Sequence, residues 1–188
     1  MTESTAMNRA DDVVTFLKNQ HEEIKACFAR VSSATGKQKQ EEFDHLRRLL
    51  AVHETAEEEV VHPRAKSEIA NGEKIVDARR EEENEAKHVL SELEKLDVNS
   101  SEFAAKLESF RKDVVAHAEA EEHEEFNQLA GELDADQLSR MRRAVEIAES
   151  TAPTRPHPGV ESAPANMLAG PFASMLDRAR DLITGKSS

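Results

Sequence analysis

Two short stretches of this 188-residue chain carry the same pattern of residue types that bind metals. The segment His53-Glu-Thr-Ala-Glu57-Glu returns 64 residues later as His117-Ala-Glu-Ala-Glu121-Glu. A histidine and a glutamate four residues apart lie about 40° apart around a helix, so both side chains leave from one face. Mixed imidazole and carboxylate ligands suit iron, manganese or zinc. Each stretch can therefore supply two ligands to a metal ion.

Four long helices are expected to position these residues. Apolar residues recur at alternating spacings of three and four within residues 10–33, 38–69 and 101–130, and a less regular stripe runs through residues 73–96. Short breaks separate these segments. Four amphipathic helices with short connections predict an all-α fold, in which an up-down-up-down four-helix bundle spans residues 10–131.

The chain continues beyond the predicted bundle. Residues 132–149 are expected to form a short fifth helix, capped by Asp134 or Asp136. Residues 150–166 are rich in proline and form a predicted linker. Residues 167–185 have the pattern of an amphipathic C-terminal helix. We expect this last helix to dock onto the bundle, onto a second copy of the chain in a homo-oligomer, or onto a protein partner.

Composition narrows the class of protein. The formal net charge of −13 argues against a nucleic-acid partner, because phosphate contacts need a basic patch. Cys27 is the only cysteine, which rules out an internal disulfide framework. We see neither a signal peptide at the N-terminus nor an apolar run of the roughly 18 residues that a membrane span needs. A cytoplasmic protein is the expectation.

The apolar stripes of the predicted helices contain histidines and glutamates. An ionised carboxylate buried without a partner is very costly, and the stripes of the first, second and fourth helices contain no Lys or Arg to neutralise it. Metal ions would do so. Six ligands are too many for one structural zinc ion, whereas two bridging carboxylates fit a pair of ions about 3.5–4 Å apart. The predicted metal ligands are His21, His53, Glu57, His88, His117 and Glu121.

The remaining histidines are predicted to lie away from this site. On an α-helix, His62 would lie about 180° around the axis from His53, and His123 about 120° from His117. We therefore expect the following histidines to be solvated or peripheral: His45, His62, His123 and His157.

Over about residues 10–130 the chain resembles hemerythrin-like (HHE cation-binding) domains. The likeness rests on the segment Asp11 to Ile24, on the two H-x-x-x-E elements and on Glu-Ala-Lys-His88, in that order. It implies two non-haem iron ions joined by an oxo or hydroxo bridge. In this resemblance Glu57 and Glu121 bridge the ions, and the terminal ligands are His21, His53, His88 and His117.

The chain also departs from the oxygen-carrying hemerythrins. Those proteins have five histidines, one of them a turn before the third-helix histidine, where this chain has Asn84. They also have an H-x-x-x-x-D element, where this chain has His117-x-x-x-Glu121. The missing imidazole leaves a position to be filled by water, by Glu85 or by Glu54.

Two functions follow as expectations. The first is a di-iron protein that binds or reacts with a small diatomic or peroxide ligand (O2, H2O2 or NO), with catalase- or peroxidase-like turnover as the enzymatic form. The second is a non-enzymatic sensor or iron-binding module that signals through its C-terminal tail. A ferritin-like enzyme would need two Glu-x-x-His motifs, and Glu85-x-x-His88 and Glu59-x-x-His62 have this spacing. On an α-helix, however, His62 would point away from the site, so the second motif fails.

Overall fold

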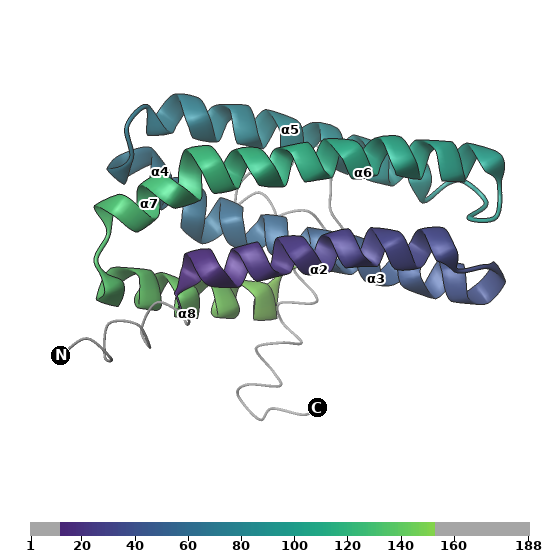
Figure 1. The fold of residues 1–188 in the computed structure, drawn as a ribbon, viewed down its shortest axis with the longest axis horizontal. Helices are drawn as coiled ribbons and strands as arrows, with labels where there is room; N and C mark the ends of the chain where they lie inside the picture. Colours follow the sequence, from purple (N-terminus) through teal and green to yellow (C-terminus); the bar gives the residue numbers. More distant parts are fainter. Residues whose placement is uncertain (1–11, 153–188) are drawn as a thin grey trace, which may run out of the picture.

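The computed structural model describes residues 12–152, and helices make up nearly all of this part of the chain (Figure 1). Its long helices are α2 (Val13–Ser33), α3 (Gly36–Ala56), α5 (Gly72–Leu93) and α6 (Ser101–Glu121). Shorter segments continue two of them. After α3 come η1 (Glu57–Val61) and α4 (His62–Glu68), and after α6 come η2 (Glu122–Phe126), α7 (Asn127–Glu132) and then α8 (Ala135–Thr151). No strand occurs within residues 12–152, so the prediction of an all-α fold is confirmed.

Side chains supplied by the sequence define where several helices begin. Asp12 Oδ1 accepts a hydrogen bond from the Thr15 amide at 2.8 Å and caps α2. Ser100 caps α6 in the same way. At α8, Asp134 and Gln137 exchange side chain-to-backbone hydrogen bonds as a capping box, which confirms the first of the two predicted caps. Each cap satisfies an amide that has no partner inside its helix.

Two π-helical turns interrupt the segments that were expected to be continuous α-helices. The turn η1 begins at Glu57, and η2 begins directly after Glu121, so each follows one copy of the repeated motif. A π-helical turn inserts about one extra residue and rotates everything after it by about 100° relative to an α-helix. Assigning residues to a helix face by α-helical periodicity is therefore valid before these turns and not valid after them.

The helices pack in pairs around a divided core (Figure 1). The helix α2 lies beside α3, and α5 lies beside α6, while α8 packs against α2, α3 and η1. One apolar cluster, nearer α8, includes Leu17, Val61, Phe126, Leu129 and Val145. The other lies farther along the helices and includes Phe28, Leu46, Leu90, Phe103 and Phe110. A layer of polar side chains separates the two clusters.

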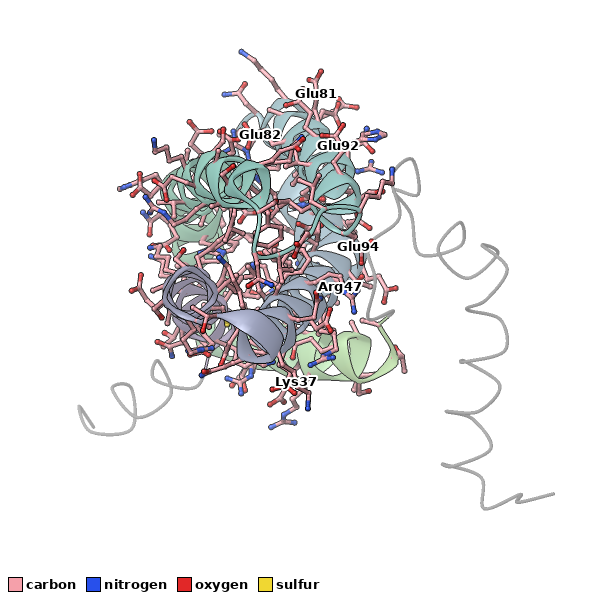
Figure 2. The ribbon with its side chains drawn as sticks, turned by 90° about the vertical axis from the view of Figure 1, so that its right-hand side faces the viewer. Lys37, Arg47, Glu81, Glu82, Glu92 and Glu94 are labelled. Atoms are coloured by element: carbon pink, nitrogen blue, oxygen red, sulfur yellow. The ribbon has the colours of Figure 1, made fainter. Side chains whose placement is uncertain are left out.

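Charged side chains cover the outside of the bundle, as the end-on view in Figure 2 shows. Arg47 of α3 binds Glu94, just beyond α5, at 2.6 Å and ties the two helix pairs together. None of the helices described in residues 12–152 is long and apolar enough to cross a membrane. The predicted helix 167–185, His157 and most of the predicted linker 150–166 lie outside the described residues.

The start of α5 offers a test of this packing. A Cβ atom added at Gly72 would lie 2.3 Å from the carbonyl oxygen of Ala65 in α4, whereas one added at Gly131 in α7 meets nothing within 4 Å. We expect Gly72→Ala to destabilise the protein by about 1–3 kcal/mol through overpacking. Gly131→Ala is the control, and we expect it to stabilise by about 0.5 kcal/mol through the unfolded chain. Urea unfolding measures both changes, and equal effects would contradict the α4–α5 contact.

Candidate metal centre

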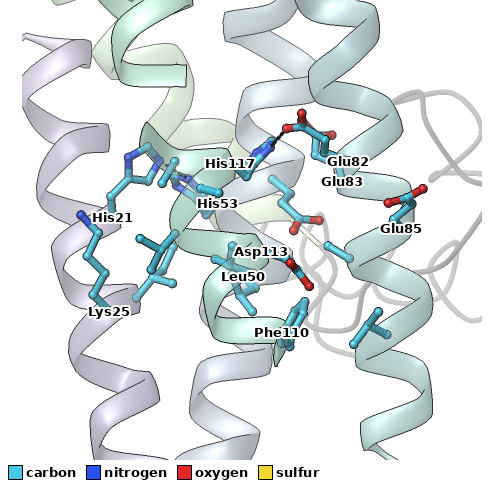
Figure 3. Close-up of a pocket in the computed structure, with 18 residues that line it drawn as sticks. His21, Lys25, Leu50, His53, Glu82, Glu83, Glu85, Phe110, Asp113 and His117 are labelled. Atoms are coloured by element: carbon cyan, nitrogen blue, oxygen red, sulfur yellow. Dashed lines mark hydrogen bonds and ion pairs between the residues drawn. The ribbon is translucent and has the colours of Figure 1, made fainter. Parts of the chain in front are cut away.

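A layer of buried ionisable side chains crosses the bundle between the two apolar clusters (Figure 3). Its position follows from each helix in turn. On α2, for example, His21 lies between Leu17 of one cluster and Ile24 of the other. Glu57 and Glu121 are both 0% exposed. The full layer consists of His21, His53, Glu57, Glu83, His117 and Glu121.

These side chains form two groups that share two carboxylates. Within each group, one ligand atom from each of four residues lies within 4.8 Å of the others. The first group contains His21 and His53, and the second contains Glu83 and His117. Glu57 and Glu121 belong to both groups. Such an arrangement suits two cations side by side, with the shared carboxylates between them.

The outer nitrogen of each imidazole in the layer has a partner. His21 Nδ1 lies 2.9 Å from Glu122 Oε1, and His117 Nδ1 lies 2.8 Å from Glu82 Oε2. His53 Nδ1 lies 2.8 Å from the Gln20 side-chain oxygen. These acceptors require the proton on Nδ1, which leaves the lone pair on Nε2 facing the layer. Metal-binding histidines are oriented by contacts of this kind.

Two of these inner nitrogens face one another. His21 Nε2 and His53 Nε2 are 3.0 Å apart. With the protons on Nδ1, two lone pairs would point at one another, and this repulsion is relieved by a proton or a metal cation between them. His117 Nε2 likewise lies 3.2 Å from Glu121 Oε1. The three imidazoles are therefore arranged to donate electron pairs inward.

The buried carboxylates lack hydrogen-bond partners. Both oxygens of Glu57 and of Glu121, and one oxygen of Glu83, form no hydrogen bond with any side chain or backbone group in residues 12–152. Buried polar groups are normally paired, and an unpaired carboxylate is especially costly. Two cations would satisfy these oxygens together with the inner nitrogens. The residues present thus fit a pair of metal ions.

Burial and mutual repulsion perturb the ionisation of the metal-free layer. Burial raises the pKa of Glu57 well above its usual range, and the charges of Glu121 and Glu83 add to the rise. Burial opposes the ionisation of Glu121, but attraction to His117 and His21 outweighs it and lowers that pKa well below the usual range. Burial opposes protonation of His117, but Glu121 outweighs it and raises that pKa well above the usual range. Burial lowers the pKa of His53 to about 3. Metal binding must therefore displace protons from Glu57 and His117, and it strengthens as pH rises.

The structure brings five of the six predicted ligands together and places His88 apart from them. His88 is exposed, and the face that α5 turns inward carries Arg79, Glu83 and Lys87 instead. Lys87 pairs with Glu58 inside the bundle. Periodicity places His88 only beside a less regular apolar stripe, and it misses the inward face because buried charged residues do not register in such a stripe. From α5 it is Glu83, and not His88, that belongs to a ligand group of the layer.

His62 is buried, which makes the prediction of a solvated or peripheral residue wrong. It is 2% exposed, and its two nitrogens lie 2.6 Å from Glu83 Oε1 and 3.1 Å from Glu125 Oε1. The reason is η1, whose extra residue rotates His62 toward the centre of the bundle. Glu125 becomes buried through η2 in the same way. Counting with α-helical periodicity missed both residues, because the two π-helical turns change the face on which they lie.

Other predicted positions fall as follows. His45 and His123 are exposed, as expected, and so is Glu85. Glu54 lines the cavity beside the layer, and burial raises its pKa to about 8. Asn84 is half-buried on α5. Neither Glu54 nor Glu85 belongs to the two ligand groups of the layer, where Glu83 stands instead.

A third group of possible metal ligands consists of Glu23, Cys27 and His45. Arg30 Nη2 lies 2.8 Å from the Cys27 sulfur, so a positive charge already occupies this place. Burial raises the pKa of the Cys27 thiol to about 11. A protonated thiol beside a guanidinium is a poor metal ligand and a poor nucleophile. This group therefore does not resemble the central layer.

Comparison with known proteins gives consistent results. The model of the hemerythrin HHE cation-binding domain matches residues 12–129. The chain is 26% identical to an uncharacterised hemerythrin-like protein of Schizosaccharomyces pombe, over 71% of this chain and 67% of that protein. It is 24% identical to a Nostoc protein named DNA nickase, over 71% of this chain and 38% of that protein. A crystal structure of a hemerythrin HHE cation-binding domain-containing protein from Mycobacterium kansasii has the same fold, with a TM-score of 0.65, 19% identity, and coverage of 89% of this chain and 98% of that one.

The shared carboxylate Glu121 provides the sharpest test of the layer. We expect Glu121→Ala to reduce metal content from two ions per chain to at most one, because both ligand groups lose a member. The variant should also lose the stabilisation that bound metal provides, about 2.7 kcal/mol at a hundredfold excess over Kd. Glu119→Ala, an exposed glutamate on the same helix, is the matched control. Elemental analysis and thermal unfolding measure the two effects. Full occupancy in Glu121→Ala would show that the layer is not the metal site.

Proposed function

Because the chain belongs to the hemerythrin HHE cation-binding domain family, we propose that its central layer holds two iron ions. In this proposal Glu57 and Glu121 would be shared by the two ions, because both belong to each ligand group. His21 and His53 complete one site, and His117 and Glu83 complete the other. The observation that carries the proposal is the pair of ligand groups with two carboxylates in common. We take the long helices to form the up-down-up-down bundle expected from the sequence.

We propose that this centre reacts with O2, H2O2 or NO, with catalase- or peroxidase-like turnover of peroxide as its enzymatic form. Bound iron supplies the redox chemistry, and the protein supplies orientation and a protected environment. Glu122, Gln20 and Glu82 hold the imidazoles with their inner nitrogens toward the ions. The two apolar clusters on either side restrict the access of water.

The mixture of ligands favours reaction over reversible oxygen carriage. The layer offers three imidazoles and three carboxylates, whereas the oxygen-carrying hemerythrins use five histidines. Anionic, hard carboxylate oxygens stabilise the higher oxidation state of iron more than neutral imidazoles do. His62 binds Glu83 and Glu125 from outside the layer and holds Glu83 in position.

We do not extend the name of the Nostoc relative to this chain. The matched stretch covers only 38% of that protein. The chain carries a net charge of −13, and binding to a phosphate backbone depends on Lys and Arg contacts.

The reduced protein, prepared without oxygen, tests the proposed function. We expect about two iron ions per chain, and an ultraviolet-visible spectrum that changes on addition of O2, H2O2 and NO in turn. Oxygen evolution from H2O2 would identify catalase-like activity. The Glu121→Ala variant should lose both the spectrum and the turnover. An iron-loaded protein whose spectrum none of the three ligands changes would overturn the proposal.

A specific contact supports the sensor as a second candidate. The Gln20 side chain accepts from His53 Nδ1 and donates to Glu149 Oε1 at 2.5 Å. Glu149 lies in the last turns of α8, which leads directly into the C-terminal residues. A change in the position of His53 can therefore reach the start of the tail through two hydrogen bonds.

Limited proteolysis of the tail distinguishes this candidate. A sensor predicts that the reduced and oxidised proteins differ at least threefold in the rate of cleavage after residue 152. Glu149→Ala should remove the difference. Glu146→Ala, an exposed glutamate on the same helix, should keep it. Equal cleavage rates in the two oxidation states, with peroxide turnover intact after removal of residues 153–188, would reject the sensor and leave the enzyme.

A further inference from the structure

A cavity of about 300 Å³ lies directly beside the metal layer, among α2, α3, α5 and α6. The imidazoles of His21, His53 and His117 form one end of it (Figure 3). The view in Figure 3 places Leu50 and Phe110 farther along the bundle, away from the imidazoles. The cavity therefore has a polar end at the metal ligands and an apolar end within the second hydrophobic cluster.

The apolar end is built from side chains of all four helices. Ile24 and Leu50 contribute from α2 and α3, Val89 from α5, and Phe110 and Val114 from α6. Most of these residues belong to the well-packed second cluster, so the space is bounded by a fixed wall. An apolar wall of this kind favours contact with an apolar group over contact with water.

The size of the cavity exceeds what the smallest ligands require. An apolar protein cavity of about 150 Å³ holds a benzene molecule, and one water molecule takes about 30 Å³ in the liquid. O2, NO and H2O2 are each close to water in size. After allowance for two cations, the cavity of about 300 Å³ still has room for one aromatic ring or a short alkyl chain.

The charges at the edge of the cavity select against anions. Glu85 and Asp113 line it and are exposed, and Glu82 is half-buried beside them. Lys25 is the cationic side chain among the lining residues, and it pairs with Glu22 at 2.7 Å. The charge of two cations in the layer would be largely offset by the three carboxylates that hold them, so a ligand with its own negative charge would approach against the acidic edge. An uncharged molecule would not.

From these observations we propose that the cavity binds a small uncharged organic molecule. Its apolar body lies against Leu50, Phe110 and Val114, and its oxygen-bearing end faces His117 and Glu83. Organic hydroperoxides have both an apolar body and the peroxide group on which the proposed function acts, so they are the ligand class we propose. This part of the inference rests on that proposed function. The binding site itself does not.

Benzyl alcohol and benzoate are matched probes for the cavity, because they share a ring and differ in charge. We expect the full-length, metal-loaded protein to bind benzyl alcohol at least tenfold more tightly than benzoate, as measured by calorimetry or ligand-observed NMR. Ala86→Leu fills part of the cavity and should weaken benzyl alcohol binding at least tenfold. Ala144→Leu, a half-buried alanine of α8 outside the cavity, is the control and should bind as the parent does.

Equal binding of the two probes, or no binding of benzyl alcohol to the parent protein, would overturn the proposal even if Ala86→Leu failed to fold. Unchanged binding to a folded Ala86→Leu, verified by circular dichroism and metal content, would overturn it as well. Binding does not require turnover. A protein that binds benzyl alcohol in the predicted way but reacts with no peroxide would support the binding site and reject the proposed function. Peroxide turnover without probe binding would support the proposed function and reject the binding site.

Discussion

Two carboxylates share the centre of this bundle, and the surrounding structure depends on how their charge is neutralised. Glu57 and Glu121 are fully buried, and none of their oxygens has a hydrogen-bond partner in residues 12–152. Two unit charges 4 Å apart repel by about 4 kcal/mol at the effective dielectric of a protein, and desolvation adds several kcal/mol for each ion. Without metal the fold tolerates this because burial raises the pKa of Glu57, which keeps that carboxyl protonated, and the raised pKa of His117 places a positive charge beside Glu121. Cations there would turn an unfavourable layer into a favourable link between the helices.

The support of this layer extends beyond the segment that defines the family. His21 and His117 are held by acidic side chains close to the layer, but His53 is held by an amide, and that amide is anchored by Glu149. Glu149 lies after residue 129, where the match to the family ends. The helix α8 therefore does more than cover an apolar face of α2 and α3. It takes part in orienting His53, and it connects that histidine to the last turns of α8.

The sequence was sufficient to locate most of this arrangement. Stripes of alternating spacing three and four predicted the all-α class and placed His21, His53, Glu57, His117 and Glu121 on inward faces, where the structure brings them together. It was insufficient on α5, because Arg79, Glu83 and Lys87 are buried there and a hydrophobicity pattern reads such residues as surface. It was also insufficient for His62 and Glu125. Their burial depends on π-helical turns, which leave no signature in residue type that α-helical counting can detect.

Those two turns also have a consequence for how the helices can bend. Bends in helices concentrate at a few kinds of site, and π-helical turns are one of them. The turn η1 begins at Glu57 and η2 begins directly after Glu121, so both helices are interrupted where the two shared carboxylates lie. A bend at either turn moves α4 or α7 and leaves His21, His53 and His117 in place on α2, α3 and α6. The bundle is thus jointed at its polar layer.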